Sequence, residues 1–136
     1  MKFGIIRERK NPPDRRTPLT PSLCADFRSR FPDHQVVVES SPDRIFSNET
    51  YQQQGIPIST DLSDCDVLLG VKEVPVDYLI PHKTYLFFSH TIKAQPYNRH
   101  LLQTILEKNI RLIDYECLAY PNDGGRILGF GYWAGV

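Results

Sequence analysis

The sequence predicts an α/β fold, a three-layer sandwich built around a mostly parallel sheet. Three observations support this prediction: short apolar runs alternate with helical segments, some of these runs are almost continuously apolar, and 136 residues fit one domain. Strands with continuous apolar runs are buried on both faces, which in α/β proteins occurs in parallel sheets that helices cover. The sequence contains no internal repeat or linker, so we expect residues 1–136 to form a single domain.

The first part of the chain predicts a strand, a loop and a helix. Residues 2–7 are apolar and β-branched, which is typical of a strand. Residues 8–19 are charged and interrupted by prolines, so we expect a loop there. Thr20 is a typical N-cap and Pro21 a typical first helical residue, and together they predict a helix that runs to about Phe31.

The middle of the chain predicts three strands and one short helix. The apolar run at residues 35–39 is expected to form the second strand. Asn48 is expected to cap a short helix that Gly55 ends. The apolar runs at residues 66–72 and 84–89 predict the third and fourth strands.

The last part of the chain predicts a helix and two more strands. Leucine and isoleucine recur at helical spacing within residues 95–109, and Asn109 is a typical helix stop. Residues 110–114 are expected to form the fifth strand. A turn at residues 121–125 then precedes a last predicted strand at residues 126–130.

The composition argues against several classes of protein. Lysine and arginine, 16 together, balance 16 acidic residues, which is unlike the basic footprint of a general nucleic-acid binder. No apolar run reaches the roughly 18–20 residues of a membrane-spanning helix, and charge appears too early in the N-terminal residues for a signal peptide. Three cysteines without a CxxC pair suit reduced thiols. We therefore expect a cytoplasmic protein with no nucleic-acid or membrane partner.

Four ionisable side chains follow four of the predicted strands. Arg16 lies in the loop after the first strand, and Lys72 ends the third. His90 directly follows the fourth strand, and Glu116 lies just beyond the fifth. Ligands of open parallel sheets bind outside the carboxyl ends of the strands. These four groups are therefore expected to converge on one rim of the sheet as a small-molecule site.

The residue types at this rim suit carboxylate binding and proton transfer. A neutral histidine beside a lysine can move protons near neutral pH, and the planar guanidinium of Arg16 can bind a carboxylate through two hydrogen bonds. Taken singly, a lysine or glutamate at a strand end is often only a solvated residue. A histidine there is often structural, and adjacent arginines often form only a basic loop. The expected convergence of the four is what favours a site.

Three other patterns lack the spacing that their chemistry requires. The glycines within residues 129–135 follow GxGxxxG rather than the GxGxxG of a dinucleotide-binding turn. The four histidines have no metal-ligand spacing with the cysteines, so we expect no metal site. The GxSxG motif of serine hydrolases does not occur in the sequence.

Several motifs carry a resemblance to a known family. The run RTPLTP at residues 16–21 resembles the opening of the alanine dehydrogenase/pyridine nucleotide transhydrogenase superfamily, and VKEVP at residues 71–75 is similar to its VKEP segment. FSHTIKAQ at residues 88–95 and LIDYE at residues 112–116 resemble the saccharopine dehydrogenases, above all the lysine–2-oxoglutarate reductase half of bifunctional lysine-degrading enzymes. FGYWAGV at residues 130–136 is similar to the segment that leads those proteins into their nucleotide domain.

The resemblance implies a flavodoxin-like or Rossmann-like N-terminal catalytic domain of an NAD(P)-dependent amino-acid dehydrogenase. The residues that match Lys72 and His90 act as the acid–base pair of that family, and the one that matches Arg16 binds a substrate carboxylate. The implied reaction joins lysine and 2-oxoglutarate into saccharopine, or splits saccharopine, with NAD or NADP as cofactor. Further matches to the lining of the site, with less defined roles, are Lys93, Gln95 and Glu116.

The second domain of that family, with its GxGxxG turn, has no counterpart in these residues. We therefore expect residues 1–136 to be the substrate-binding and catalytic domain alone, which should neither bind a dinucleotide tightly nor turn over by itself. The apolar, glycine-rich residues 130–136 favour a domain cut from a longer polypeptide over a natural stand-alone module.

Two alternatives stay open. One is an alanine dehydrogenase-like domain, against which the FSHTIKAQ run favours the saccharopine type. The other is a non-catalytic module for binding or oligomerisation. The expected partner is an amino acid or 2-oxo acid. The sequence leaves the choice between NAD and NADP, the direction of the reaction and homo-oligomer formation undecided.

Overall fold

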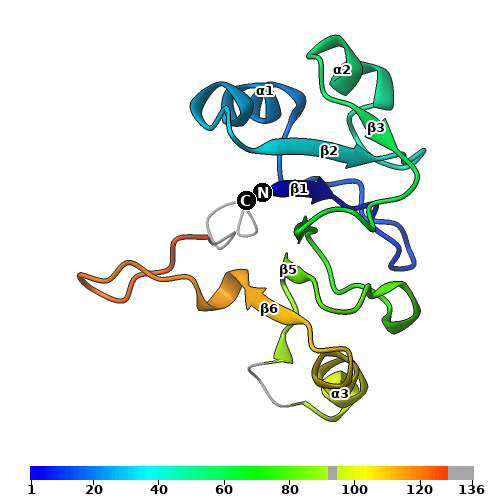
Figure 1. Ribbon diagram of the computed structural model, residues 1–136. Helices are drawn as coiled ribbons and strands as arrows, with labels where there is room; N and C mark the ends of the chain where they lie inside the picture. Colours follow the sequence, from blue (N-terminus) through cyan, green and yellow to red (C-terminus); the bar gives the residue numbers. More distant parts are fainter. Residues whose placement is uncertain (92–94, 129–136) are drawn as a thin grey trace.

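The computed structural model describes residues 1–91 and 95–128, and within these residues it contains one six-stranded sheet (Figure 1). The strand order is β3-β2-β1-β4-β5-β6, and every neighbouring pair is parallel. This arrangement confirms the predicted α/β class. The strands are β1 (Lys2–Ile5), β2 (Gln35–Glu39), β3 (Ile58–Ser59), β4 (Val67–Leu69), β5 (Thr84–Phe87) and β6 (Arg111–Asp114).

Helices lie at both ends of the sheet (Figure 1). Helices α1 and α2 lie beside β2 and β3, while α3 lies beside β6. Short 3-10 turns follow β4, precede α3 and follow β6 in the described residues. The α-helices are α1 (Pro21–Arg30), α2 (Asn48–Gln53) and α3 (Arg99–Glu107), and the 3-10 turns are η1 (Val76–Tyr78), η3 (Pro96–Asn98) and η4 (Tyr115–Cys117).

Hydrophobic side chains form two clusters, one on each face of the sheet. The consecutive residues Ile5 and Ile6 belong to different clusters, because successive side chains of an extended segment point to opposite faces. Cys24 of α1 packs into the cluster of Ile5, whereas Leu101 and Ile105 of α3 pack into the cluster of Ile6. Helices thus cover both faces, and the predicted three-layer sandwich is confirmed.

The local signals around α1 act as predicted. The Thr20 hydroxyl accepts a hydrogen bond from the Leu23 N–H at 3.2 Å, which satisfies one of the free donors of the first turn. Pro21 occupies the first helical position and Phe31 follows the last one. Strand β2 has the predicted bounds.

Asn48 does not cap α2, so that prediction is wrong. Ser47 precedes the first helical residue, and Asn48 already belongs to the helix. The Asn48 side chain instead accepts a hydrogen bond from the Ser41 N–H and donates one to the Ser40 hydroxyl. Tertiary contacts with the end of β2 therefore use the amide that was expected to cap the helix.

Strands β1, β4 and β5 are shorter than predicted, and the carboxyl ends of β1 and β4 show why. The Arg7 N–H donates to the carboxylate of Glu39, and the Val71 N–H donates to that of Glu8. Carboxylates at these positions take the place of carbonyl groups of a neighbouring strand, so the ladder stops. The strand predicted at residues 126–130 is reduced, within the described residues, to one antiparallel bridge between Ala119 and Arg126, and residues 129–130 lie outside them.

The helix predicted at residues 95–109 is divided into η3 and α3. Asn109 follows α3 with a φ of 53°, in the left-handed region that asparagine tolerates well. The predicted helix stop is therefore confirmed. The two-residue strand β3 was not predicted, because so short an element has no periodicity.

Candidate active site

The four residues expected at one rim follow strands that are neighbours in the sheet. Arg16 lies after β1, Lys72 after β4, and His90 and Glu116 after β5 and β6. Parallel strands bring their carboxyl ends to the same edge, so the structure places all four side chains along this carboxyl edge. Their roles stay a prediction.

His90 lies between two carboxylates. Its Nδ1 is 3.3 Å from Oε1 of Glu116, and its Nε2 is 3.9 Å from Oε1 of Glu73. Both glutamate side chains are only 11% exposed, whereas the imidazole is 31% exposed. Among the described residues Nδ1 has no aligned hydrogen bond. A histidine held between carboxylates yet open to solvent can bind a ligand and exchange a proton with it.

The backbone of His90 has an unusual conformation that buried polar groups fix. Its φ of 59° lies in the left-handed region, which is uncommon outside glycine. The Asn98 side chain donates to the His90 carbonyl at 3.0 Å. The preceding residue, Ser89, is fully buried and donates to the Asp114 carboxylate through its N–H and its hydroxyl. The turn that presents His90 is thus set by the core.

Asp114 also fixes Glu116. Its other oxygen, Oδ1, accepts the Glu116 N–H at 2.9 Å at the start of η4. The buried Asp114 carboxylate therefore joins the end of β5 to the end of β6. It positions both His90, through Ser89, and Glu116, whose carboxylate lies closest to the imidazole. Loss of this carboxylate would leave several buried donors without an acceptor.

Arg16 forms a bidentate ion pair with Asp14. The distances from Arg16 to the Asp14 carboxylate are 3.0 Å for Nε–Oδ1 and 2.6 Å for Nη2–Oδ2. This pair, above all, lowers the pKa of Asp14, and the charge of Lys72 lowers it further. Arg16 and Lys72 therefore act on the same carboxylate, which puts them on one side of the carboxyl edge. Half of the Arg16 side chain is exposed, so it can also meet a ligand.

A cavity of about 670 Å³ lies beside Arg16 over one face of the sheet. Aromatic side chains from β1, α1, the segment before α2 and the ends of β5 and β6 line much of it. They are Phe3, Phe27, Phe46, Phe88 and Tyr115. Tyr115 is buried, and this burial raises the pKa of its phenol, so the hydroxyl stays protonated at neutral pH. The cavity therefore offers a ligand both the guanidinium of Arg16 and an apolar, aromatic surface.

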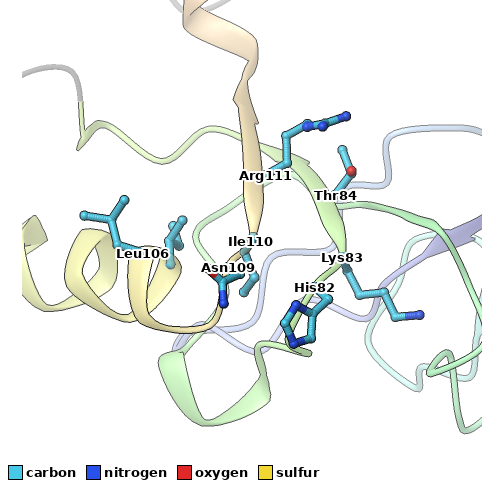
Figure 2. A pocket seen from close by; sticks show the side chains of 8 residues that line it. His82, Lys83, Thr84, Leu106, Asn109, Ile110 and Arg111 are labelled. Atoms are coloured by element: carbon cyan, nitrogen blue, oxygen red, sulfur yellow. The ribbon is translucent and has the colours of Figure 1, made fainter.

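A second hollow, of about 600 Å³, lies at the opposite, amino edge of the sheet (Figure 2). Figure 2 shows His82, Lys83 and Thr84 around the start of β5. It also shows Asn109 and Ile110 between α3 and β6, and Arg111 at the start of β6. This hollow is also lined by basic side chains, but none of the site residues that the sequence predicted lines it. The carboxyl edge therefore stays the better candidate.

The two other predicted lining residues differ in their outcome. Lys93 lies outside the described residues, and Gln95 does not join the group of four. Gln95 is exposed at the start of η3 and lines a separate hollow with Thr91 and Arg99. Three acids that the sequence analysis did not select do join the site: Glu8, Asp14 and Glu73. The position of Glu73, directly after Lys72, was the one signal available for it.

The described residues do not suit a metal ion or a dinucleotide. In residues 1–91 and 95–128 no three potential ligands among histidine, cysteine, aspartate and glutamate gather as a metal would require. The connection from β1 to α1 contains no glycine, whereas a dinucleotide needs a tight glycine-rich turn at that point. The cysteines are free, and burial raises the pKa of both Cys24 and Cys65 to about 11, which keeps these thiols protonated.

Comparison with protein families decides the relationship. The model of the alanine dehydrogenase/PNT N-terminal domain matches residues 4–136. This chain belongs to that family. The fold agrees with that of an L-alanine dehydrogenase structure, with a TM-score of 0.73 and 23% sequence identity. This match covers 90% of the present chain and 34% of the alanine dehydrogenase chain.

The curated relatives of this family member are saccharopine-type enzymes. Alpha-aminoadipic semialdehyde synthase of Arabidopsis thaliana is 43% identical over 136 residues, which are 97% of this chain and 13% of the relative. Its mitochondrial namesake in Bos taurus is 42% identical over 98% of this chain and 14% of the relative. Saccharopine dehydrogenase [NAD(+), L-lysine-forming] of Emericella nidulans is 28% identical over 96% of this chain and 36% of the relative.

The chain spans about a seventh of the semialdehyde synthases and about a third of the saccharopine dehydrogenase. The comparisons therefore show family membership and similarity to these oxidoreductases for residues 1–136, and not for the remaining parts of the relatives. The described residues include no helix long and apolar enough to cross a membrane. Because three relatives are named as mitochondrial, the cytoplasmic location stays a prediction.

Proposed function

We propose that this chain is the substrate-binding and acid–base domain of an NAD(P)-dependent oxidoreductase of the saccharopine dehydrogenase type, acting on a CH–NH bond. One observation carries the proposal: His90, in a left-handed conformation that the core fixes, lies between Glu73 and Glu116 at the carboxyl edge. Strained, over-determined residues of this kind concentrate at functional sites. The names of the most similar relatives supply the reaction class.

Arg16 is the proposed carboxylate-binding residue. A 2-oxo acid such as 2-oxoglutarate carries carboxylates that need cationic partners, and a guanidinium binds them through two parallel hydrogen bonds. Asp14 already holds the guanidinium in this bidentate geometry. The side chain is therefore oriented before the substrate arrives, which reduces the entropy lost on binding.

Lys72 and His90 are the proposed acid–base pair. When an amine adds to the keto carbon of 2-oxoglutarate, the carbonyl oxygen must gain protons before it leaves as water, and the nitrogen must lose one. An ammonium and an imidazole on adjacent strand ends can supply and accept these protons. Glu73 and Glu116 orient the imidazole. Glu116 also lines the proposed site, and Lys93, which the family resemblance matches to the lining, is proposed to line it as well.

NAD or NADP would be the hydride carrier of this enzyme class. Because the described residues lack a dinucleotide turn, we place its binding site outside them. The chain alone is therefore proposed to bind substrate without turnover. The fold likeness to L-alanine dehydrogenase carries no choice of substrate, because identity there is 23%.

The first test of the proposal is a ligand titration of the ¹⁵N-labelled chain. Addition of 2-oxoglutarate or saccharopine is expected to shift the amide signals of Arg16, Lys72 and His90, whereas alanine and pyruvate at the same concentration should shift them less. Shifts confined to the amino edge, or none at millimolar ligand, would remove the site assignment.

The second test measures turnover in a chimera in which these residues replace the matching segment of the Arabidopsis relative. Lys72→Met and His90→Gln are each expected to reduce kcat by roughly 10²–10⁴-fold, the usual size of acid–base catalysis. A loss confined to KM would make the two residues binding groups instead.

A further inference from the structure

Glu8 is a buried acid that the proposed mechanism does not use. It lies just after β1, is 8% exposed and comes from a loop that otherwise faces solvent at many positions. A carboxylate without a purpose at such a depth would be costly, because burial favours its neutral form. Its contacts therefore indicate what it does.

The Glu8 carboxylate spans the gap between the ends of β1 and β4. Oε1 accepts the Val71 N–H at 2.6 Å, and Oε2 accepts the Lys72 N–H at 3.1 Å. Both oxygens are thus used on two consecutive backbone donors, one of which belongs to the proposed acid–base lysine. Gly70, directly before them, lies against the side chain of Ile6; a Cβ there would lie 2.8 Å from Ile6 Cδ1 and 3.4 Å from Oε1 of Glu8.

We infer that Glu8 is a positioning residue, which fixes the backbone of Lys72 and so sets where its ammonium group meets the substrate. The inference rests on the proposed function of Lys72. Glu8 acts through this backbone and not on the substrate, so it is not counted among the catalytic groups.

The charged and polar groups around Glu8 support a role at the site rather than in the core. Asp14 and Arg16 face Glu8 from the β1–α1 loop, Arg44 from the loop after β2, and Tyr115 from η4. The carboxylate therefore lies at the centre of the carboxyl edge. Burial raises the pKa of Glu8 more than the two backbone hydrogen bonds lower it. Its ionised form is therefore less favourable in the folded chain than in solvent.

The primary test follows the Val71 and Lys72 amide protons of the labelled chain through a pH titration. An amide that donates to a carboxylate changes its shift when the carboxylate is protonated. Both signals are expected to titrate with one common midpoint above 4.5, the ordinary glutamate value. This measurement needs no variant. Two amides that do not titrate together would overturn the inference.

The second test compares Glu8→Gln with Glu39→Gln. Glu39 is also buried and also accepts a backbone N–H, that of Arg7, but it does not contact Lys72. Glu8→Gln is expected to shift the Lys72 amide, to abolish the common titration and to weaken 2-oxoglutarate binding about tenfold, the effect of losing one charge-assisted contact. Glu39→Gln should leave all three unchanged.

Stability separates positioning from a merely structural role. Since glutamine resembles protonated glutamate, and the raised pKa of Glu8 means that protonation favours the folded chain, the urea midpoint of Glu8→Gln at pH 7 should not fall below that of the original chain. Glu39→Gln loses the ion pair with Arg9 and should lower it. Weaker binding only in proportion to lost stability would overturn the inference.

Lys72→Met distinguishes the two proposals. If Lys72→Met binds 2-oxoglutarate and turns over in the chimera as the original does, the proposed function fails, whatever Glu8 does. If Lys72→Met is impaired while Glu8→Gln behaves like Glu39→Gln, the proposed function stands and the positioning role of Glu8 fails.

Discussion

The two edges of the sheet handle charge in opposite ways. At the carboxyl edge, Glu8, Glu39 and Asp114 are all less than 9% exposed and accept hydrogen bonds from backbone N–H groups. At the amino edge, Asp64 pairs with Lys2 in solvent, and Lys83 and Arg111 line the open hollow of Figure 2. Both edges carry many charged side chains, but among the residues named here only those of the carboxyl edge are buried.

The difference teaches where to look for function in a sheet that carries charge at both ends. Exposed ion pairs cost little and contribute little, so the ion pairs of the amino edge can change with little effect on the stability of the fold. Buried carboxylates must be matched by well-placed donors. The carboxyl edge therefore has a fixed geometry, and fixed geometry is what binding and proton transfer require.

The largest expected difference between the edges is in stability. Asp114→Ala would leave the Ser89 N–H, the Ser89 hydroxyl and the Glu116 N–H without their acceptor, at an expected cost of about 3 kcal/mol. Asp64→Ala should leave the urea midpoint unchanged, because its partner stays hydrated. Equal losses from the two variants, measured by urea unfolding at pH 7, would contradict the contrast.

The next difference concerns which cationic edge binds the substrate. Arg16→Lys keeps the charge but loses the bidentate geometry, so the affinity for 2-oxoglutarate should fall about 10–100-fold. Arg111→Lys, at the amino edge, should leave it unchanged. Isothermal titration of both variants decides between them, and a larger loss in Arg111→Lys would transfer the site to the hollow of Figure 2.

The smallest effect is a pH dependence at the carboxyl edge. The pair with Arg16 lowers the pKa of Asp14 in the folded chain, so its stabilisation is present above the ordinary aspartate pKa of 3.8 and is lost as the pH falls through the lowered value. Asp14→Asn should lower the urea midpoint slightly at pH 7. The difference between the two chains should vanish well below pH 3.8. A difference that persists at acid pH would mean that Asp14 acts through packing.

The sequence was sufficient where the signal is local. Thr20 and Pro21 specify the start of α1 through contacts within one turn, and the apolar run of β2 has its bounds because it is buried on both faces. The positions of Arg16, Lys72, His90 and Glu116 at one edge followed from parallel pairing, which the apolar runs predict. Short-range chemistry and one topological rule account for these successes.

What the sequence did not reveal depends on partners far away in the chain. Asn48 has the residue type of a cap, but its side chain bonds to the end of β2. Glu8 lies in a charged loop and looks solvated until its partners in the turn after β4 are known. Glu73 and Asp14 are likewise recognised as site residues only from their contacts in the structure, Glu73 with His90 and Asp14 with Arg16.

The hydrogen bonds of Glu8 join residues that are 63 and 64 positions apart, and they exist only where β1 and β4 pair. A pairing of this sequence separation requires a long loop to close before any contact is made, so it is slow to form compared with a local turn. A fragment shorter than about 65 residues cannot contain both halves of this contact. The candidate site therefore cannot form from local contacts alone. It forms only when the central strands β1 and β4 pair.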